Sequence, residues 1–503
     1  MKIFSAKQFR RWDAFTIEHE PITSIELMER AAQACVNWMV TKQWEERAIK
    51  VFCGKGNNGA DGLTIARLLL EQGYYAAIYI LEFGKTGSDE FQQNLQRLHN
   101  ITDELHFIQS QEQFPFLHSK DIIIDALFGT GLNKPLHGLS NELVGHINAS
   151  GATTISIDVP SGLFIDDSSI GNTIIQANYT VTFQLLKLGL LLQENAAYVG
   201  EVKLLPIGLH TEFLKKEQST FELIEAEYIK QIYKPRNRFA HKGHFGHALI
   251  AAGSWGKMGA AVLAAKACLR SGVGLLTCFM PTCGHSIMQT SVPEAMVLSD
   301  DNPMILASIP EDLEKYSAVG IGPGIGTDPD TQNFLSGLIA VCKKQVVLDA
   351  DGLNCLALQK DALTLLSPYS ILTPHPKEFD RLFGEHNSDF ERIKTARKKA
   401  MELQIIILLK GHHTFIATPS GAGYFNSTGN AGMAKGGSGD VLTGILTSLL
   451  AQEYEPVHAA ILGVYIHGLA GDLAAQTLSM ETMLPSDLIL FLSGASKEIQ
   501  KSE

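Results

Sequence analysis

The sequence has little cysteine. Seven cysteines are scattered through 503 residues, and none of them stands in a Cys-x-x-Cys spacing. A disulfide scaffold or a thiolate zinc site needs clustered or regularly spaced cysteines. The scatter disfavours both and predicts a protein of the reducing cytoplasm.

Long apolar runs are also scarce. The start, MKIFSAKQFRRWDAF, has basic residues but neither the apolar segment nor the small-residue cleavage site of a secretion signal. Later apolar stretches such as Ile405 to Leu409 are as long as a buried strand and much shorter than a membrane span. We therefore expect a cytoplasmic protein without a membrane partner.

Positive charge is in deficit. The 41 lysines and arginines face 53 aspartates and glutamates, which gives a formal net charge of −12. This balance argues against a general nucleic-acid or membrane surface, although backbone amides can still build a local anion site. A chain of this length is expected to fold as two domains of roughly 200 to 280 residues.

The stretch Asn426 to Gly444, NSTGNAGMAKGGSGDVLTG, crowds glycines into a turn that ends at Asp440 and continues as an apolar helix. Gly436, Gly437 and Gly439 let successive amides point at one anion, and the helix dipole adds to the same spot. A carboxylate there is suited to take a proton from a substrate hydroxyl. GGSGD alone also fits a plain turn capped by an aspartate, so the other motifs must decide.

The first half reads as a parallel α/β unit. Thr23 and Glu26 form a capping-box pattern before an amphipathic helix, and the strand AIKVFCG leads into the loop GKGNNGADG, the helix LTIARLLLEQG and the strand AAIYILE. Strands at Asp121 to Leu127 and Thr153 to Ile157 also end in polar, glycine-containing loops. Three such loops are expected to meet at one edge of the sheet, where α/β folds place ligands.

The stretch from His210 to about Glu225 is polar and shows no clear strand, so we place the domain boundary there and expect domains of residues 1–220 and 226–503. From His247 a second alternating pattern begins, with the strand HALIAAG and the small-residue helix GKMGAAVLAAKACLRSG. It predicts another α/β domain with a mostly parallel sheet.

In the first half, GKGNNGADGL, DALFGTGLNKPL and IDVPSGL resemble the YjeF N-terminal domain family, the NAD(P)H-hydrate epimerases. In the second half, GKMGAAVLAA, GPGIG, DADGLN, TPHPKE, KGHHT and GNAGMAKGGSGD resemble the ADP- or ATP-dependent NAD(P)H-hydrate dehydratases, a ribokinase-like family. The resemblance covers nearly the whole chain, in the order of proteins that fuse both activities. It implies a Rossmann-like three-layer domain followed by a ribokinase-like three-layer α/β/α domain.

The resemblance also implies a function, the repair of hydrated NADH and NADPH, which carry a hydroxyl at C6 of the nicotinamide ring. The epimerase interconverts the R and S forms (NADHX and NADPHX), and the dehydratase converts the S form to NAD(P)H at the expense of ADP or ATP. Potassium at the first site and magnesium with the nucleotide at the second are implied. The motifs do not decide between ADP and ATP, though we lean to ADP. A symmetric homo-oligomer is expected.

In the first site, the resemblance assigns dinucleotide binding to two segments and to Asp158. The segments are Asn57, Asn58, Gly59, Ala60 and Asp61, and Gly129, Thr130, Gly131, Leu132, Asn133, Lys134 and Pro135. Asn58, Asp125 and Ser161 match the family's potassium ligands, and their oxygen donors suit a hard cation.

Asp158 is the expected acid–base residue of the first site. Epimerisation at a carbon that bears nitrogen and hydroxyl requires loss and return of the hydroxyl, or ring opening, and either route needs a proton relay. Lys187 resembles a family lysine near this site, but a surface lysine is an equal interpretation. Ala60 stands where the family usually has glycine, which is tolerable if the backbone angle is ordinary.

In the second site, phosphorylation converts the hydroxyl into a better leaving group. Asp440 is expected to activate the hydroxyl for attack on the terminal phosphate, while the amides of Gly437 to Gly439 stabilise the transferred charge. Family matches place Ala260, Gly324, His375 and Asp440 at the hydrate, and Lys410, Gly411, His412, His413, Thr414 and Gly439 at the adenine nucleotide. Lys377, Ala431 and Lys435 depart from the family pattern, and Lys435 could strengthen nucleotide binding.

Two other functions are open. The chain could be a ribokinase-type small-molecule kinase that releases a phosphorylated product, and the first half could be a non-catalytic ligand-binding module. The hydrate motifs weigh against the first. The joint presence of Asn58, Asp125, Asp158 and Ser161 weighs against the second.

Overall fold

The structure is a computed structural model that describes residues 1–82, 84 and 86–501. The chain divides into two compact units, one of Lys2–Ser219 with Ser388–Phe390 and the other of Met1, Thr220–Asn387 and Glu391–Glu503. Each unit has its own sheet, with helices packed on both faces, and each is described separately below.

The sheet of the first unit is parallel throughout. Its strands, in the order β4-β3-β2-β5-β6-β7-β8, are β4 (Leu105–Ile108), β3 (Ala76–Leu81), β2 (Ile49–Cys53), β5 (Ile122–Ala126), β6 (Thr153–Ile157), β7 (Tyr179–Phe183) and β8 (Glu201–Leu205). The strand order reverses beside β2. The connections after β2 and β5 therefore leave in opposite directions, which opens a crevice at the carboxyl ends of these strands.

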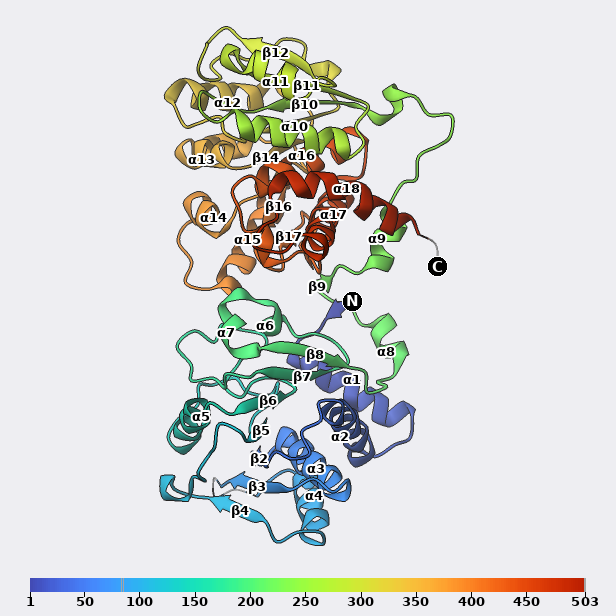
Figure 1. The fold of residues 1–503 in the computed structure, drawn as a ribbon, viewed down its shortest axis with the longest axis vertical. Coiled ribbons are helices and arrows are strands. Elements are labelled where there is room, and N and C mark those ends of the chain that lie inside the picture. The colour runs from blue at the N-terminus through green and yellow to red at the C-terminus, as the bar shows by residue number, and fades with distance from the viewer. Residues whose placement is uncertain (83, 85, 502–503) are drawn as a thin grey trace. The chain divides into compact units, whose positions relative to one another are not determined.

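Helices cover both faces of this sheet (Figure 1). They are α1 (Ala6–His19), α2 (Ser24–Val40), α3 (Asn57–Glu71), α4 (Asp89–His99), α5 (Leu139–Ala149), α6 (Leu188–Leu191), α7 (Ala196–Val199) and α8 (Thr211–Lys216). Side chains alternate along a strand. In β2, Phe52 therefore joins the apolar cluster of α5 on one face, while its neighbour Val51 lies against Gly62 of α3 on the other.

Two helix starts test the sequence patterns. The Thr23 side chain accepts from the Glu26 amide and the Glu26 side chain from that of Thr23, so the predicted capping box is confirmed. The prediction for the glycine loop was wrong, because α3 begins at Asn57 and residues 57–61 form its first turns. Ala60 therefore has a helical backbone, and it is absent from the residues with positive φ.

The sheet of the second unit is mostly parallel, as expected. Its order is β9-β18-β17-β16-β15-β14-β13-β10-β11-β12, with β9 (Phe221–Leu223), β18 (Gly423–Phe425), β17 (Phe415–Ala417), β16 (Ile406–Leu409), β15 (Ile371–Leu372), β14 (Val346–Leu348), β13 (Ala318–Ile321), β10 (His247–Ala251), β11 (Leu275–Pro281) and β12 (Met296–Asp300). Only β17 runs antiparallel to its neighbours among the described strands. The order reverses between β10 and β13, which places a second crevice there.

Helices cover both faces of the second sheet as well (Figure 1). They are α9 (Ala226–Ile232), α10 (Met258–Arg270), α11 (His285–Ser291), α12 (Pro329–Val341), α13 (Asp351–Leu358), α14 (Pro376–Phe383), α15 (Asp389–Leu403), α16 (Ser438–Ala451), α17 (Pro456–Thr477) and α18 (Pro485–Gln500). Residues of α10, α16, α17 and α18 join one apolar core with strand residues such as Ile250 and Leu408.

Two expectations about the chain need correction. The stretch from His210 to Glu225 contains helix α8 and strand β9, although no strand was expected there. Helix α17 has 22 residues with a hydropathy of 1.3, so by length and composition it could cross a membrane, which contradicts the expected lack of long apolar runs. Because 67% of its apolar window is buried in the core, α17 has the features of a core helix.

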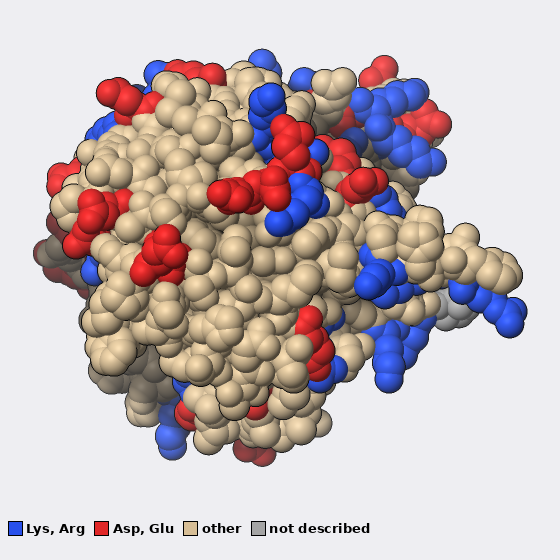
Figure 2. Space-filling model, turned by 90° about the horizontal axis from the view of Figure 1, so that it is seen from above, with Lys and Arg blue, Asp and Glu red and all other residues tan. Residues whose placement is uncertain are grey.

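Charged side chains of both signs are interspersed on the face of the molecule drawn in Figure 2, with wide areas that carry neither. No broad basic field is visible on that face.

Candidate active sites

A cavity of about 1080 Å³ lies at the crevice of the first unit. The structure brings to its lining a large part of the predicted set, together with Lys187: Asn57, Asn58, Asp61, Gly129, Thr130, Gly131, Leu132 and Asp158. Among the described residues, the predicted Gly59, Ala60, Asn133, Lys134 and Pro135 lie outside this lining. The three strand ends β2, β5 and β6 thus contribute to one site.

Asp158 follows β6 and has a φ of +68°, a left-handed angle that is rare for a residue other than glycine. Its side chain accepts from the Lys187 ammonium, with 2.7 Å between Nζ and Oδ1. Lys187 is 1% exposed and also donates to Thr182 Oγ1 and the Phe183 carbonyl, at 2.6 and 3.1 Å. The surface-lysine interpretation was therefore wrong.

Asp125 and Ser161 form a buried polar cluster beside this cavity. Ser161 donates to Asp125 from its amide at 2.9 Å and from its hydroxyl at 2.6 Å, and Ser156 donates at 2.7 Å. Burial raises the pKa of Asp125, and these hydrogen bonds oppose the rise. The Ser161 hydroxyl in turn accepts from the Phe128 amide at 2.8 Å, so the cluster fixes the start of the loop after β5.

Asn58, the third predicted potassium ligand, lies near this cluster. Its side chain lies beside Gly129, and its Nδ2 is buried with no hydrogen-bond partner in the described structure. If the amide oxygen and nitrogen exchanged places, the oxygen would occupy this position and could face a cation. With Asp125 and Ser161 close by, the donor chemistry fits a hard monovalent ion.

Sequence reasoning missed one acidic residue of the first cavity. Asp13 lies on α1 and lines the cavity together with Asp61 and Asp158. Burial and then the charge of Asp158 raise the pKa of Asp13 to about 6, while Lys187 acts in the opposite direction. Burial likewise raises the pKa of Asp61 well above its usual range. Asp13 belongs to no loop motif. The only signal in the sequence is its spacing of four residues from Phe9, which places both side chains on one face of a helix.

In the second unit, Asp440 lies in the first turn of α16, after Gly437, whose φ of +103° favours glycine. Burial and then the charge of Asp349 raise the pKa of Asp440 to about 7, and Lys410 opposes them. A side chain on Gly439 would meet Asp349 Oδ2 at 3.0 Å, so glycine is required there for close approach. The Ser438 amide already donates to the Lys435 carbonyl at 3.3 Å, which leaves the amides of its two glycine neighbours as candidates for a phosphate.

Asp349 and Glu378 complete the second site and were not predicted. Lys410 Nζ lies 2.7 Å from Asp349 Oδ1 and 3.8 Å from Glu378 Oε2, and the Thr443 hydroxyl donates to Asp349 at 3.0 Å. Burial alone would raise the pKa of Asp349, but Lys410, together with hydrogen bonds from Thr373 and Thr443, outweighs burial and lowers the pKa. Asp349 directly follows the buried strand β14, which is the signal that could have identified it.

His375 is the N-cap of α14. Its Nδ1 accepts from the amides of Lys377 and Glu378 at 3.1 and 3.3 Å, so Nε2 carries the proton of the neutral ring. Burial lowers the pKa of His375, which favours this neutral form. Gly324 lies against Ala260 and Lys257, so the structure brings together two of the residues expected at the hydrate.

The segment expected at the adenine nucleotide is more open. Gly411 and His412 are exposed, and His413 and Thr414 are half-buried. Lys435 donates to the carbonyls of Glu481 and Met483 at 2.6 and 2.7 Å, so its ammonium ties down this loop. That contact weighs against the expected role of Lys435 in nucleotide binding. Lys377 and Ala431 are exposed.

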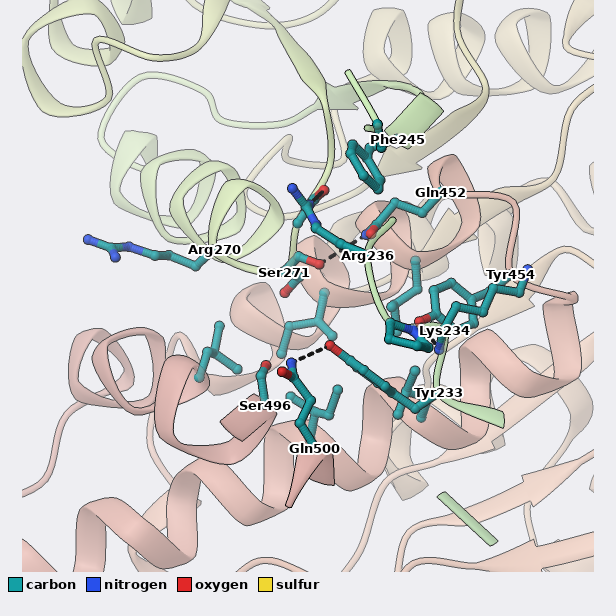
Figure 3. Close-up of a pocket in the computed structure, with 18 of the residues that line it drawn as sticks. Tyr233, Lys234, Arg236, Phe245, Arg270, Ser271, Gln452, Tyr454, Ser496 and Gln500 are labelled. Atoms are coloured by element: carbon teal, nitrogen blue, oxygen red, sulfur yellow. Dashed lines mark hydrogen bonds between the residues drawn. The ribbon is translucent and has the colours of Figure 1, made fainter. Parts of the chain in front are cut away.

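A second cavity of about 970 Å³ lies at the carboxyl end of α16 (Figure 3). Tyr233 and Gln500 are joined by a 2.6 Å hydrogen bond across it, and Arg236 lies over the Phe245 ring. None of the described residues in its lining is an aspartate or glutamate. Without a carboxylate to act as a base, this cavity does not fit the chemistry expected of the second unit.

Comparisons with known proteins match both units. The family described as NAD(P)H-hydrate dehydratase matches residues 248–493, and the family described as YjeF-related protein N-terminus matches residues 24–189. A relative from Moorella thermoacetica, the bifunctional NAD(P)H-hydrate repair enzyme Nnr, is 35% identical over 517 residues, which cover 100% of this chain and 98% of its own length.

Two solved structures resemble the second unit. A ribokinase-like superfamily protein from Enterococcus faecalis is 27% identical with a TM-score of 0.51, covering 56% of this chain and 98% of that protein. An ADP/ATP-dependent NAD(P)H-hydrate dehydratase from Bacillus subtilis, co-crystallised with ATP and Mg²⁺, is 31% identical with a TM-score of 0.49, covering 56% of this chain and 99% of that one. The expected α/β fold class, with a ribokinase-like second unit, is confirmed.

Proposed function

The chain belongs to the family of bifunctional NAD(P)H-hydrate repair enzymes, and we propose that two domains, residues 1–220 and 226–503, divide the repair of hydrated NADH and NADPH between them. The first domain epimerises the R and S forms, and the second dehydrates the S form to NAD(P)H at the expense of ADP or ATP. One observation carries the proposal: in a chain related to these enzymes over its full length, each sheet presents a candidate acid–base aspartate at its crevice.

The second domain performs dehydration as a phosphoryl transfer. Asp440 takes the proton of the C6 hydroxyl while the hydroxyl oxygen attacks the terminal phosphate, and the amides beside it stabilise the developing charge. The ring nitrogen then expels phosphate, which regenerates the reduced nicotinamide. Neutral His375, whose Nε2 also lies 3.4 Å from Glu378 Oε1, contacts the hydrate, and Ala260 with Gly324 shapes another part of the wall.

Lys410 and the segment Gly411 to Thr414 bind the adenine nucleotide, together with Gly439. Asp349 already accepts from Lys410 and Thr443, and Asp351 pairs with Lys257, so these carboxylates do not form a free cage for a metal. We therefore propose that magnesium arrives bound to the nucleotide phosphates, where it neutralises charge. ADP is the favoured nucleotide.

In the first domain, Asp158 relays the proton next to the nicotinamide ring, and Lys187 holds its carboxylate in place. Asn58, Asp125 and Ser161 would hold potassium, which would fix the loop after β5 against the dinucleotide. The segments 57–61 and 129–135 contact the dinucleotide through their exposed side.

We propose that the enzyme acts in the cytoplasm as a homo-oligomer. Phe239 and Trp255 in the second unit are 87% and 67% exposed, and association would remove such surfaces from water. Light scattering of the purified protein measures the assembly, and a monomer at micromolar concentration contradicts it.

The function is tested by mixing the protein with R and S NADPH-hydrate, magnesium, potassium and ADP or ATP, and following recovery of the near-ultraviolet absorbance of NADPH. Recovery of the whole mixture supports both activities. Recovery of the S portion alone leaves only the dehydratase. A phosphorylated alcohol product with no NADPH would instead indicate the small-molecule kinase.

A further inference from the structure

The cavity of the first unit contains an acidic side chain that no motif or comparison assigns. Phe9, Asp13 and Ile17 of α1 all line this cavity. Because they are four residues apart, they share one face of the helix, with neighbouring side chains one turn from each other. Asp13 therefore lines the cavity from α1.

The neighbouring contacts locate Asp13 with respect to the proposed base. The Phe9 ring centroid lies 4.6 Å from Lys187 Nζ, and Lys187 Nζ lies 2.7 Å from Asp158 Oδ1. Asp13 is one helical turn from Phe9, lines the same cavity as this ion pair and interacts electrostatically with both of its members. In the described structure Asp13 takes part in no ion pair or hydrogen bond, unlike Asp158, so its proton is free to be exchanged with a ligand.

The two carboxyl groups differ in their surroundings, because Asp158 is paired with the Lys187 ammonium and Asp13 is not. Burial and the charge of Asp158 raise the pKa of Asp13 to about 6. The other charged groups around the cavity are Lys187 and Asp61, with Arg10 on the same helix and Lys55 at the rim. Two carboxyl groups that line one cavity in different environments, one paired with a lysine and one not, are a usual arrangement for an acid and a base that work together.

We propose that Asp13 is the general acid of epimerisation and that Asp158 is the general base opposite it. The inference rests on the proposed epimerase function. Protonated Asp13 donates its proton to the C6 hydroxyl, the C6–O bond breaks, water leaves and the ring nitrogen's electron pair forms an iminium with C6. A water molecule on the other face then attacks C6 and gives a proton to Asp158. Water returns the proton from Asp158 to Asp13, so atoms and charges balance, and the reverse direction uses the same groups in exchanged roles.

The test uses the full-length enzyme with Asp13→Asn. Conversion of R to S NADPH-hydrate is followed with saturating nucleotide, and the S form alone is assayed in parallel as an internal control for the second unit. We expect kcat for the R form to fall about 100-fold with KM nearly unchanged, since general acid–base groups contribute roughly 10² to 10⁴-fold. Repair of the S form should stay at the wild-type rate.

Two further readouts separate an acid from a structural residue. In the wild type the epimerisation rate should fall as the pH rises above about 6, because Asp13 loses its proton, and this fall should vanish in Asp13→Asn. In water enriched in oxygen-18, the S product should carry solvent oxygen at C6. Asp13→Glu, which keeps the acid, should recover part of the rate.

Asp166→Asn is the matched control. Asp166 is an exposed carboxylate that accepts from the Ala6 amide at the start of α1, and it lies outside the cavity lining. It should leave epimerisation unchanged. An unchanged kcat in Asp13→Asn, a change in KM alone, or a product without solvent oxygen overturns the role of Asp13. A wild type that converts no R form overturns the epimerase function itself.

Discussion

Both units place a lysine among carboxylates, but they pair it differently. In the first unit Lys187 lies 2.7 Å from Asp158, the proposed base, and the neighbouring Asp13 has no ion-pair partner among the described residues. In the second unit Lys410 lies 2.7 Å from Asp349, and within the described part of the chain no cation is paired directly with Asp440, the proposed base. The lysine thus pairs with the proposed base itself in the first unit and with the aspartate beside the proposed base in the second.

This difference has a chemical consequence. A cation on the working carboxylate fixes its position and favours its ionised form. A cation on the neighbouring carboxylate keeps that neighbour ionised, and the negative charge of Asp349 then helps to raise the pKa of Asp440 to about 7. A base that must take a proton from an alcohol works best with its pKa near the operating pH. The pairing of Lys410 with Asp349 therefore suits Asp440 to act as the base that takes a proton from an alcohol.

The largest expected effect is that of Asp440→Asn. An amide cannot accept the hydroxyl proton, so dehydration of the S form should fall by roughly 10² to 10⁴-fold. Interconversion of R and S should continue, which chiral chromatography of the hydrates measures. Asp328→Asn, which keeps the N-cap of α12, is the control and should retain full activity. Normal dehydration by Asp440→Asn would contradict the assignment of the base.

Lys187→Met should impair epimerisation in the first unit and leave dehydration in the second unit unchanged. It leaves Asp158 without its buried partner, and we expect roughly a 100-fold loss of epimerisation, within the usual range for acid–base groups. Removal of one partner of a buried pair also costs about 3 to 5 kcal/mol of stability, so the thermal midpoint should fall. The R fraction would then remain after all S hydrate is repaired.

The control for this variant is Lys203→Met. Lys203 pairs with Glu201 in β8 and is not part of the cavity lining. It should change neither activity. If Lys187→Met epimerises normally, the pairing with Asp158 is structural and the comparison between the two lysines fails.

The pH dependence sharpens the contrast. Asp440 must be ionised to act, so dehydration should rise with pH, about tenfold per unit below pH 7, and level off above it. Because folding raises this pKa, the folded state holds its proton more tightly than the unfolded chain. Stability from this group therefore falls as the pH rises from about 4 to about 7.

Asp349→Asn tests the cause of that shift. Removing the negative charge next to Asp440 should move the acid side of the profile to lower pH. The maximal rate should also fall, since Lys410 then turns to Asp440. A profile that does not move would mean that burial alone sets the pKa.

The sequence located the strand ends well, because a polar residue after a buried strand is visible as a pattern. Asp158 follows β6 in this way, whereas Asp125 lies within β5 and Asp440 was found from the glycine-rich turn that begins α16. The roles expected for Asp125 and Asp158 came from the family resemblance. The pairing of Lys187 with Asp158, the location of Asp13 and the contact of Lys435 with Glu481 depend on packing between distant segments, which no local pattern encodes. The start of α3 was missed because its glycines favour a loop, and tertiary packing overrides that preference.

The smallest expected effect concerns Ala60, the position at which the family resemblance led us to expect glycine. Ala60 is fully buried in α3, and its amide donates to the Gly56 carbonyl at 3.0 Å as the helix begins. Glycine is about 1 kcal/mol less favourable than alanine inside a helix, so Ala60→Gly should lower the local stability of α3 by about that amount. Hydrogen exchange of peptides from α3 should report faster opening, and epimerisation should be unchanged because Ala60 lies outside the cavity lining.

Ala60→Val tests the same position with a larger side chain instead of a smaller one. The site is closed, so two extra methyl groups overpack it at about 1 to 3 kcal/mol and push the first turn of α3 toward the cavity. That turn carries Asn58 and Asp61, so this variant, unlike Ala60→Gly, should raise KM for the hydrate while dehydration of the S form stays normal. Equal KM values in both variants would show that the cavity does not depend on where α3 begins, and that the alanine stabilises the helix without shaping the site.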